Sequence, residues 1–179
     1  MSRIEIDESK ILGNGNRIYW MFGMICRASK KCRIYCVLNN RTRDTLLPIL
    51  KANVITNNDL NEYENDEEIK KYSLCTRIYS DCWSAYQINV FYESGYLLHR
   101  VNHSVWFGSG LFHTNSVEGL WAQIKRLCNN FAGINFNLLD NLENNGISPK
   151  DYLDDWICWA IFLRECEMNK FNKINKFSI

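Results

Sequence analysis

The amino-acid sequence predicts an α/β domain in which helices pack against one mixed β-sheet. Segments rich in aromatic and β-branched residues, which are typical of strands, occupy much of residues 3–38, and two stretches with apolar residues at helical spacing follow residue 113. A further helical segment and a short strand lie between residues 38 and 113. The sequence has no internal repeat and no Gly/Pro-rich linker. This order of elements is typical of a mixed-sheet domain, and 179 residues are enough for one sizeable core.

Three strands are expected at the start of the chain. Residues 3–7 alternate between polar and apolar side chains, which is the period of a half-buried strand, so Asp7 is expected at the strand's end on its polar side. A Gly/Asn turn at 13–16 leads into the strand-like segments 18–26 and 32–38. Because the connections are short, we expect neighbouring antiparallel strands.

A helix, an acidic stretch and a fourth strand follow. The apolar residues of 41–54 lie close to helical spacing, although Pro48 is unfavourable inside a helix. The next stretch is polar and largely acidic, which predicts a surface insertion at about 57–73. A strand at 76–80 is expected to end directly before Asp81.

The last part of the chain is expected to be helical. A helix that begins near Thr114 or Asn115 carries one apolar stripe. A final helix at 149–168 has Ser148 as its cap and Pro149 at its first position, and the tail after it is expected to fray.

Charge and hydropathy narrow the class of protein. The chain has 21 basic and 20 acidic residues and a pI near 7.5, whereas a self-sufficient DNA-binding protein usually has a marked basic excess. No run of about eighteen apolar residues could span a bilayer, and the start of the chain lacks the apolar core of a secretory signal. We therefore expect a soluble, intracellular protein without a membrane partner.

The eight cysteines are expected to be mostly buried thiols, because they lie within apparent strands and helices and nothing indicates export. No CxxC pair occurs, so a zinc ribbon or finger is poorly supported. His99 and His103 do have the i, i+4 spacing that can bind zinc on a helix.

Three acidic residues stand at the ends of predicted elements: Asp7, Asp81 and Glu118. Adjacent strands could bring the first two together, and carboxylate oxygens suit Mg²⁺ or Mn²⁺. Lys125 follows Glu118 by seven residues, close to two helical turns, so it projects from nearly the same face and could meet a phosphate. Taken singly, each acid is also typical of a solvated surface group or a helix cap.

Six sequence blocks occur in an order that resembles the DDE transposases of the Merlin superfamily and related bacterial insertion sequences. Together they cover most of residues 4–130, and the 36 residues between Asp81 and Glu118 are similar to the DD36E spacing of Merlin elements. The blocks are EIDES (5–9), WMFGMICR (20–27), TLLPIL (45–50), YSDCWSAY (79–86), VNHS (101–104) and HTNSVEGLWAQIKR (113–126).

The resemblance implies a fold and a catalytic centre. The fold would be an α/β ribonuclease-H-like mixed sheet with flanking helices, with a catalytic domain at 1–135 and a helical extension at 136–179 that packs on it. Asp7, Asp81 and Glu118 would be the catalytic residues and would bind two Mg²⁺ or Mn²⁺ ions.

Other residues would support this centre. Lys125 would be the basic residue that follows the glutamate on its helix, and Asn115 would support a metal ligand or replace one. Glu8 is an alternative to Asp7 as the first ligand, because a slip of one residue at a strand end would turn it inward.

Nucleic-acid contacts are expected around this centre. His103 and His113 lie in matching blocks and either contact DNA, support the site or make structural hydrogen bonds. Trp83, Tyr86 and Trp121 could stack on unpaired bases, although aromatics beside apolar neighbours are more often core residues. The basic residues that could contact phosphates, or form an ordinary solvated face, are Lys125, Arg126, Arg41 and Arg43.

The function implied is a metal-dependent transposase domain that hydrolyses a phosphodiester at a transposon end and joins the 3′-hydroxyl to target DNA. Its partners would be double-stranded DNA and further copies of itself, as a homodimer or larger synaptic complex, in a nucleus or a bacterial cytoplasm. Such transposases usually carry a DNA-recognition region ahead of the first aspartate, and six residues precede Asp7, which favours a catalytic domain alone, a truncated copy or a domesticated derivative. The alternatives are a non-catalytic DNA-binding or interaction protein and a structure-selective nuclease on the same fold.

Overall fold

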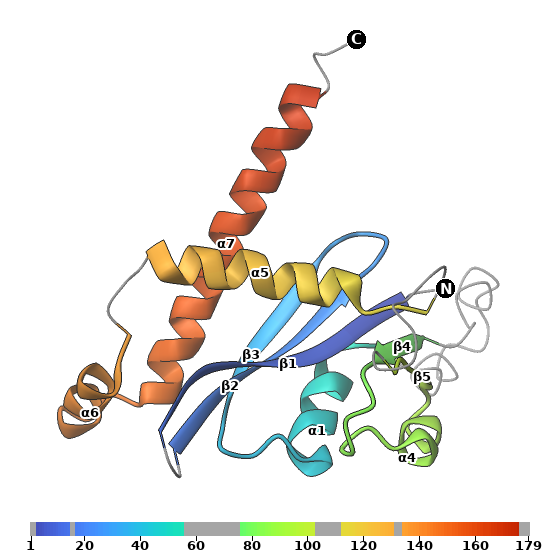
Figure 1. Ribbon diagram of the computed structural model, residues 1–179, viewed down its shortest axis with the longest axis horizontal. Helices are drawn as coiled ribbons and strands as arrows, with labels where there is room; N and C mark the ends of the chain where they lie inside the picture. The colour runs from blue at the N-terminus through green and yellow to red at the C-terminus, as the bar shows by residue number, and fades with distance from the viewer. Residues whose placement is uncertain (1–2, 15–16, 56–75, 103–111, 131–133, 176–179) are drawn as a thin grey trace, which may run out of the picture.

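The protein is built on a five-stranded mixed β-sheet (Figure 1). A computed structural model describes residues 3–14, 17–55, 76–102, 112–130 and 134–175. The strand order is β3-β2-β1-β4-β5, in which β1–β2 and β2–β3 are antiparallel pairs and β1–β4 and β4–β5 are parallel pairs. The strands are β1 (Arg3–Asn14), β2 (Arg17–Cys26), β3 (Cys32–Leu38), β4 (Arg77–Ser80) and β5 (Leu97–Arg100).

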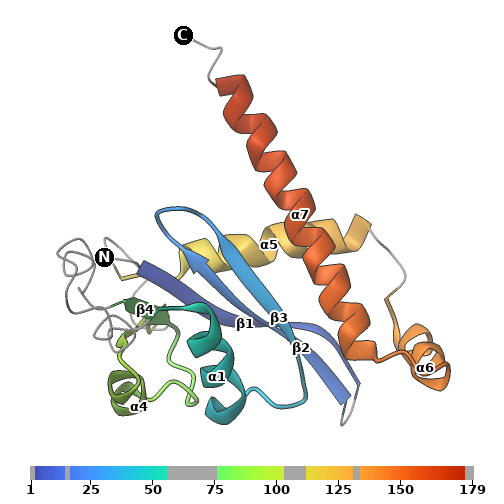
Figure 2. The ribbon, with the colours of Figure 1, turned by 180° about the vertical axis from the view of Figure 1, so that it is seen from behind.

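Helices cover both faces of this sheet, as the opposite views in Figures 1 and 2 show. One face packs against α5, α6 and α7, and the other face packs against α1 and α4. The helices are α1 (Arg43–Asn53), α4 (Ile88–Glu93), α5 (Asn115–Asn130), α6 (Phe136–Asn144) and α7 (Pro149–Asn175). The arrangement confirms the predicted α/β class, a mixed sheet with flanking helices. None of the described helices is long and apolar enough to cross a membrane.

The alternation of side chains along the strands divides them between two cores. On β2, Met21 packs in the core formed with α5, α6 and α7, and Phe22 packs in the core formed with α1 and α4. On β1, Ile6 belongs to the α1 and α4 core, whereas Glu5 and Asp7 hydrogen bond to residues of α5. The predicted faces of the first strand are therefore correct.

Two elements are longer than their sequence patterns predict. The first strand does not end at Asp7, because its antiparallel pairing with β2 continues past an irregularity between Lys10 and Leu12 as far as Asn14. The last helix does not end near 168 but continues to Asn175, and no glycine or proline in this stretch would end it.

Three short elements carry no clear sequence signal. They are α4, β5 and α6, of six, four and nine residues. The helix at 41–54 is confirmed as α1 with Pro48 inside it. The acidic insertion expected at about 57–73 lies within 56–75, outside the described residues.

The prediction that the cysteines are mostly buried is wrong for the part of the chain that the structure describes. Of six free cysteines there, Cys32 and Cys36 are buried. Cys82 and Cys158 are exposed, because the first lies after the end of β4 and the second lies on an outward-facing side of α7.

Candidate functional site

Asp7 and Asp81 are brought together by the parallel pairing of β1 with β4. Arg3 pairs with Arg77 and Glu5 pairs with Tyr79, and the same register continued by two residues places Asp7 opposite Asp81. Adjacent strands lie about 4.8 Å apart. Asp81 follows the last residue of β4, whereas Asp7 lies inside β1 rather than at its end as predicted, because β2 continues to pair with β1 on its other side.

Helix α5 places Glu118 over the same part of the sheet. The indole Nε1 of Trp121, three residues after Glu118, donates to Asp7 Oδ2 at 2.8 Å. Trp121 is buried, as a core residue would be, and it lies against Gly23, the β2 residue that pairs with Asp7. A Cβ on Gly23 would lie 2.8 Å from Trp121 Cζ2, so the absence of a side chain there lets the indole reach the sheet.

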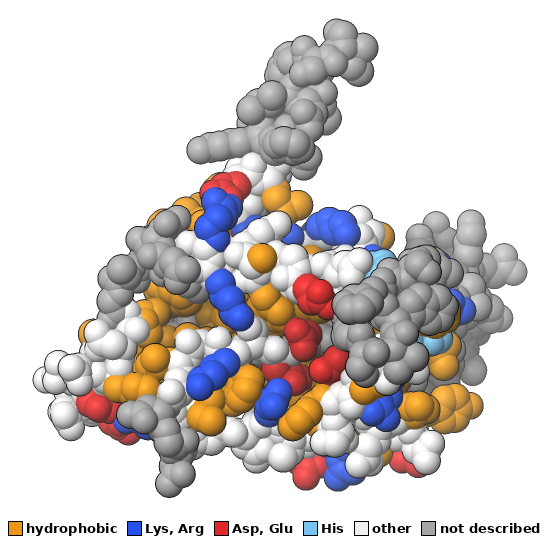
Figure 3. All heavy atoms as spheres, in the orientation of Figure 1, with side chains coloured by type: hydrophobic (Ala, Val, Ile, Leu, Met, Phe, Trp, Pro, Cys, Tyr) orange, Lys and Arg blue, Asp and Glu red, His pale blue; other side chains and the backbone are white. Residues whose placement is uncertain are grey.

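The electrostatics of Asp7 indicate that three acids are near one another. Burial raises the pKa of Asp7 to about 6, the hydrogen bond from Trp121 lowers it, and the charges of Asp81 and Glu118 raise it. We call these three carboxyl groups, together with that of Glu8, the acidic cluster. Figure 3 shows acidic side chains gathered near the middle of one face, with Lys and Arg around them.

Glu8 points to the opposite face of β1 from Asp7. Its side chain is 2% exposed and its carboxylate lies 3.5 Å from Arg41 Nη1. The Arg41 guanidinium in turn lies between the rings of Trp20 and Trp83, with ring centroids at 4.1 and 3.9 Å. Arg41 is thus packed between two indole rings rather than lying on an open solvated face, and Tyr86 is buried in the nearby core.

Burial also raises the pKa of Glu8, to about 8; the charges of Asp7 and Asp81 raise it and Arg41 lowers it. Glu8 Oε1 is buried and has no hydrogen-bond partner among the described residues. A carboxyl group with these surroundings favours its protonated form at neutral pH when no metal ion is bound.

In their present orientations the acids bond to protein donors. Asp7 accepts from Trp121, Asp81 Oδ1 accepts from the Trp83 N–H at 2.9 Å, and Glu118 Oε1 accepts from Thr114 Oγ1 at 2.8 Å. Across the described ranges, no three His, Cys, Asp or Glu side chains are grouped so that they could hold a metal ion. The donors nevertheless fit a divalent cation in chemistry, because they are partly desolvated oxygen ligands whose mutual repulsion a cation would offset.

Glu5 connects the elements that carry the acids. It is fully buried, and its Oε2 accepts from the backbone N–H groups of Ser116 and Val117, at 2.7 and 3.0 Å, in the first turn of α5. Its Oε1 accepts from Arg27 Nε at 2.6 Å. The carboxylate thus caps the helix of Glu118 from the strand of Asp7, in the position where a helix N-terminus favours a negative charge.

Arg27 extends this connection to β4. Its guanidinium lies over the ring of Tyr79, 3.8 Å from the centroid, and it also donates to the backbone oxygen of His113 just before α5. Tyr79 is two residues before Asp81. One buried ion pair therefore fixes β1, β4 and α5 relative to one another. The sequence pattern does contain a signal for Glu5, because it lies two residues before Asp7 and so on the same face of the strand.

The other predicted basic residues lie outside the acidic cluster. Lys125 is exposed on α5, two helical turns after Glu118. Arg126 pairs with Glu167 of α7 at 2.8 Å, and Arg43, at the start of α1, pairs with Asp44 at 2.9 Å.

His113 lies at the entrance to α5. Its Nδ1 accepts from the backbone N–H of Asn115 at 3.3 Å and lies 3.3 Å from Glu5 Oε1. Asn115 is exposed at the first position of α5. His99 lies on strand β5 and not on a helix, so the i, i+4 spacing to His103 is not the helical zinc pair that the sequence allowed. His103 lies outside the described residues.

No protein-family model matches this chain, and no curated protein matches it in sequence. Among solved structures, it is similar to the HTLV-2 integrase catalytic core domain in complex with magnesium, in a dimeric form. The TM-score is 0.46 and the identity 16%, over 89% of this chain and 83% of that chain. At this level of similarity the match transfers no residue roles.

Proposed function

We propose that the chain is a metal-dependent DNA transposase domain of the DDE type, similar to those of the Merlin superfamily. It would hydrolyse a phosphodiester at a transposon end and join the resulting 3′-hydroxyl to target DNA. The observation that supports the proposal is that Asp7 interacts electrostatically with both Asp81, which follows the parallel neighbouring strand, and Glu118, on the helix that faces the sheet. Their order and spacing are those of the sequence motif.

Each acid has a support that would orient it. Trp121 donates to Oδ2 of Asp7, while the Trp83 N–H holds Oδ1 of Asp81. Glu118 is fixed by the anchoring of α5 to Glu5. The ligands of two Mg²⁺ or Mn²⁺ ions would be Asp7, Asp81 and Glu118. When bound, such ions lower the pKa of an attacking hydroxyl and stabilise the leaving oxygen.

The substrate would be double-stranded DNA, both as transposon end and as target. Lys125 projects from α5 after Glu118 and would contact a phosphate, as would Arg126 and Arg43. Because two ends must be held together, the active form would be a homodimer or larger assembly. It would act where the DNA is, in a nucleus or a bacterial cytoplasm.

Substitution of Asp81 tests the proposal. Wild-type protein should nick supercoiled plasmid in Mn²⁺ and join a pre-cut 3′-hydroxyl end to it, whereas Asp81→Asn should lose both activities and keep its circular dichroism spectrum. Asp151→Asn, a change in the first turn of α7, is the matched control and should keep both activities. Unchanged activity of Asp81→Asn would refute the assignment, and nicking without joining would indicate a nuclease.

A non-catalytic DNA-binding or interaction protein is the second candidate. It is favoured by the finding that no three potential ligands in the described parts of the chain are grouped to hold a metal ion. Calorimetric titration with Mn²⁺ separates the two functions. A transposase should bind Mn²⁺ and lose that binding in Asp7→Asn. If the wild type binds DNA but no Mn²⁺, the second function is supported.

A further inference from the structure

A hollow of about 530 Å³ opens beside the acidic cluster and has no part in the function proposed so far. Residues 39–44, at the start of α1, form one side of it, and residues 83–87, which follow Asp81, form the other. Its volume lies in the range of pockets that bind small organic groups, about 300–1,000 Å³.

One side of the hollow is rich in hydrogen-bond donors. The side-chain oxygen of Asn39 accepts from the Ile18 N–H at 2.6 Å, and that of Asn40 accepts from the Thr42 N–H at 3.0 Å. Because backbone N–H groups can only donate, these bonds fix both amides with their NH₂ groups directed away from the backbone donors. Arg43 adds a guanidinium on this side.

The start of α1 adds backbone donors to the same side. Its N-cap, Thr42, makes no side-chain capping bond, and the Thr45 N–H donates to the Thr42 backbone oxygen at 3.1 Å. The N–H groups of Arg43 and Asp44, which precede that bond, are the ones that could bind an anion. Asp44 is the one acidic residue in the lining, and its pair with Arg43 is exposed. An exposed ion pair is weak, so a phosphate can replace Asp44 as the partner of Arg43.

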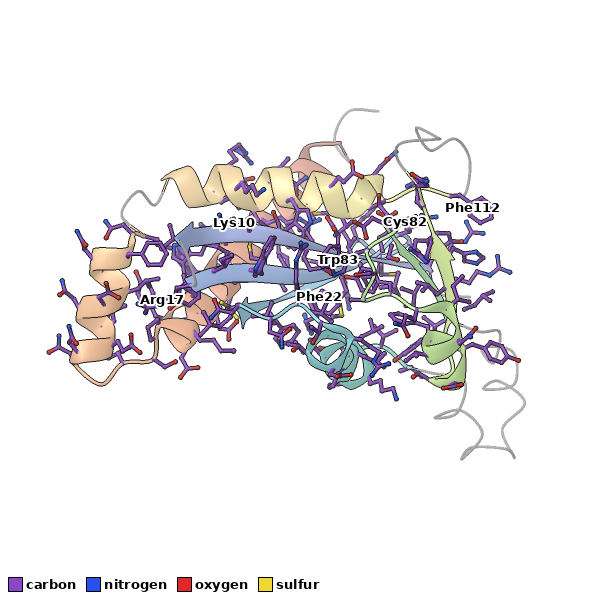
Figure 4. All side chains as sticks on the ribbon, turned by 60° about the horizontal axis from the view of Figure 1, so that its bottom comes forward. Lys10, Arg17, Phe22, Cys82, Trp83 and Phe112 are labelled. Atoms are coloured by element: carbon purple, nitrogen blue, oxygen red, sulfur yellow. The ribbon has the colours of Figure 1, made fainter. Side chains whose placement is uncertain are left out.

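The other side of the hollow is aromatic. Trp83 lines it, and Figure 4 shows this side chain lying over the strands. Its ring is one layer of a stack in which Arg41 lies between Trp20 and Trp83, and the indole Nε1 of Trp83 donates to the Arg41 backbone oxygen at 3.4 Å. The buried carboxyl group of Glu8 lies 3.5 Å from Arg41 Nη1 and helps to fix the guanidinium in this stack. A base can extend such a stack, because every base has a π-face.

The hollow is connected directly to the cluster. The backbone N–H of Trp83 donates to Asp81, so a strand whose phosphodiester lies at Asp81 continues past Trp83. We propose that the hollow binds one unpaired nucleotide of a DNA strand, with its phosphate on Arg43 and the amide donors and its base against Trp83. This inference rests on the proposed function, which places a phosphodiester at the acidic cluster.

Equilibrium binding of fluorescent DNA in EDTA tests the inference without chemistry. The probes are a duplex with a 3′ single-stranded overhang and a blunt duplex of the same sequence. Trp83→Ala should weaken binding of the overhang probe by about tenfold, as expected when a stacked base loses its partner, and should change blunt binding little. Trp83→Phe should restore most of the affinity.

Arg43→Ala provides a second test that does not depend on the aromatic stack. Because Arg43 is exposed, this variant should fold normally, and the slope of log Kd against log salt should fall by about 1 for the lost phosphate contact. Matched controls are Arg33→Ala on β3 and Trp159→Ala on α7, which lie outside the hollow and should leave both probes unchanged.

The outcomes separate the two proposals. Equal preference for the overhang probe in wild type, Trp83→Ala and Arg43→Ala would overturn the nucleotide site, even if Asp81→Asn abolished cleavage as the proposed function requires. Loss of overhang binding in both variants would support the nucleotide site. If the wild-type protein also neither binds Mn²⁺ nor cuts DNA, the catalytic function is overturned while the nucleotide site stands.

Discussion

The contact between Gly23 and Trp121 shows how one residue without a side chain can orient a candidate catalytic acid. The indole occupies the space that a Cβ on Gly23 would need, and from there its N–H reaches Asp7. Since Trp121 is also one turn from Glu118 on α5, the same ring sets the separation between strand and helix. The glycine of the WMFGMICR block thus has a packing reason that its sequence context does not reveal.

We expect Gly23→Ala to displace Trp121 and to weaken the orientation of Asp7. Overpacking of this kind costs about 1–3 kcal/mol, measurable by urea unfolding, and Mn²⁺ affinity should fall as well. Gly119→Ala is the matched control, because a Cβ there meets no atom within 4 Å and an alanine inside a helix should stabilise by about 0.5–1 kcal/mol. Equal stability of Gly23→Ala and wild type would show that the indole moves aside without cost.

The raised pKa values of Glu8 and Asp7 predict how stability depends on pH without metal. The folded-state pKa is about 8 for Glu8 and about 6 for Asp7, against ordinary values of 4.5 and 3.8. Between the ordinary and raised values the folded state binds more protons than the unfolded state, so the free energy of unfolding should decrease as pH rises from about 4 to about 8.

Urea unfolding at pH 5 and pH 8 in EDTA measures this effect. The wild type should lose more than about 1.4 kcal/mol, the equivalent of one pKa unit, and Glu8→Gln should remove most of the difference. Mn²⁺ should restore stability mainly at pH 8, where the carboxylates are free of protons. A wild-type protein that is more stable at pH 8 than at pH 5 in EDTA would contradict the burial of these acids.

At the scale of elements, the buried pair of Glu5 and Arg27 fixes β1, β4 and α5 to one another. Glu5→Gln should therefore destabilise the fold strongly, by about 3–5 kcal/mol, because the Arg27 charge loses its counter-charge and one of the two acceptor oxygens becomes an NH₂ group that cannot accept. The matched control is Glu167→Gln, which removes the exposed pair with Arg126 and should cost about 1 kcal/mol or less.

A double-mutant cycle in urea then distinguishes a coupled pair from two separate effects. If the pair acts as a unit, Arg27→Met should cost much less in the Glu5→Gln background than in the wild type. Additive costs would show that Glu5 acts on α5 alone. The unfolding midpoint temperature of Glu5→Gln, measured with and without Mn²⁺, adds a functional measure. If α5 is displaced in this variant, Mn²⁺ should raise its midpoint less than it raises that of the wild type.

The elements differ in how far the sequence could predict them. The period of residues 3–7 predicted which face Asp7 occupies, since that depends only on local alternation, but the end of β1 depends on its pairing with β2. Strand β5 and helix α4 are too short to carry a periodic signal and depend on neighbours for stability. The burial of Glu5 could not be predicted, because its helix donors lie 111 and 112 residues away in sequence.

At the scale of the whole molecule, the near-neutral charge hides an uneven distribution along the sequence. Residues 57–73 hold six acidic and two basic side chains, a net charge of −4, so the rest of the chain carries +5. The residues on either side lie close together, because Thr76 Oγ1 donates to the Ile55 backbone oxygen at 2.9 Å. The weak basic excess of the whole sequence is therefore a poor guide to the net charge of the residues outside 57–73.

Replacing residues 57–73 by a short Gly/Ser linker should keep the fold and tighten DNA binding. The flanking residues Ile55 and Thr76 are already adjacent, and shortening the connection between them should change stability little, since loop closure costs only about 0.6 kcal/mol per doubling of length. A change of +4 in net charge should lower Kd for blunt duplex several-fold at low salt and should have little effect near 1 M salt, where the Debye length is about 3 Å. The comparison requires a second variant in which the six acids are replaced by Asn and Gln at full loop length. If only the shortened variant binds more tightly, the segment acts by blocking access rather than by its charge; if neither does, DNA does not approach this side of the molecule.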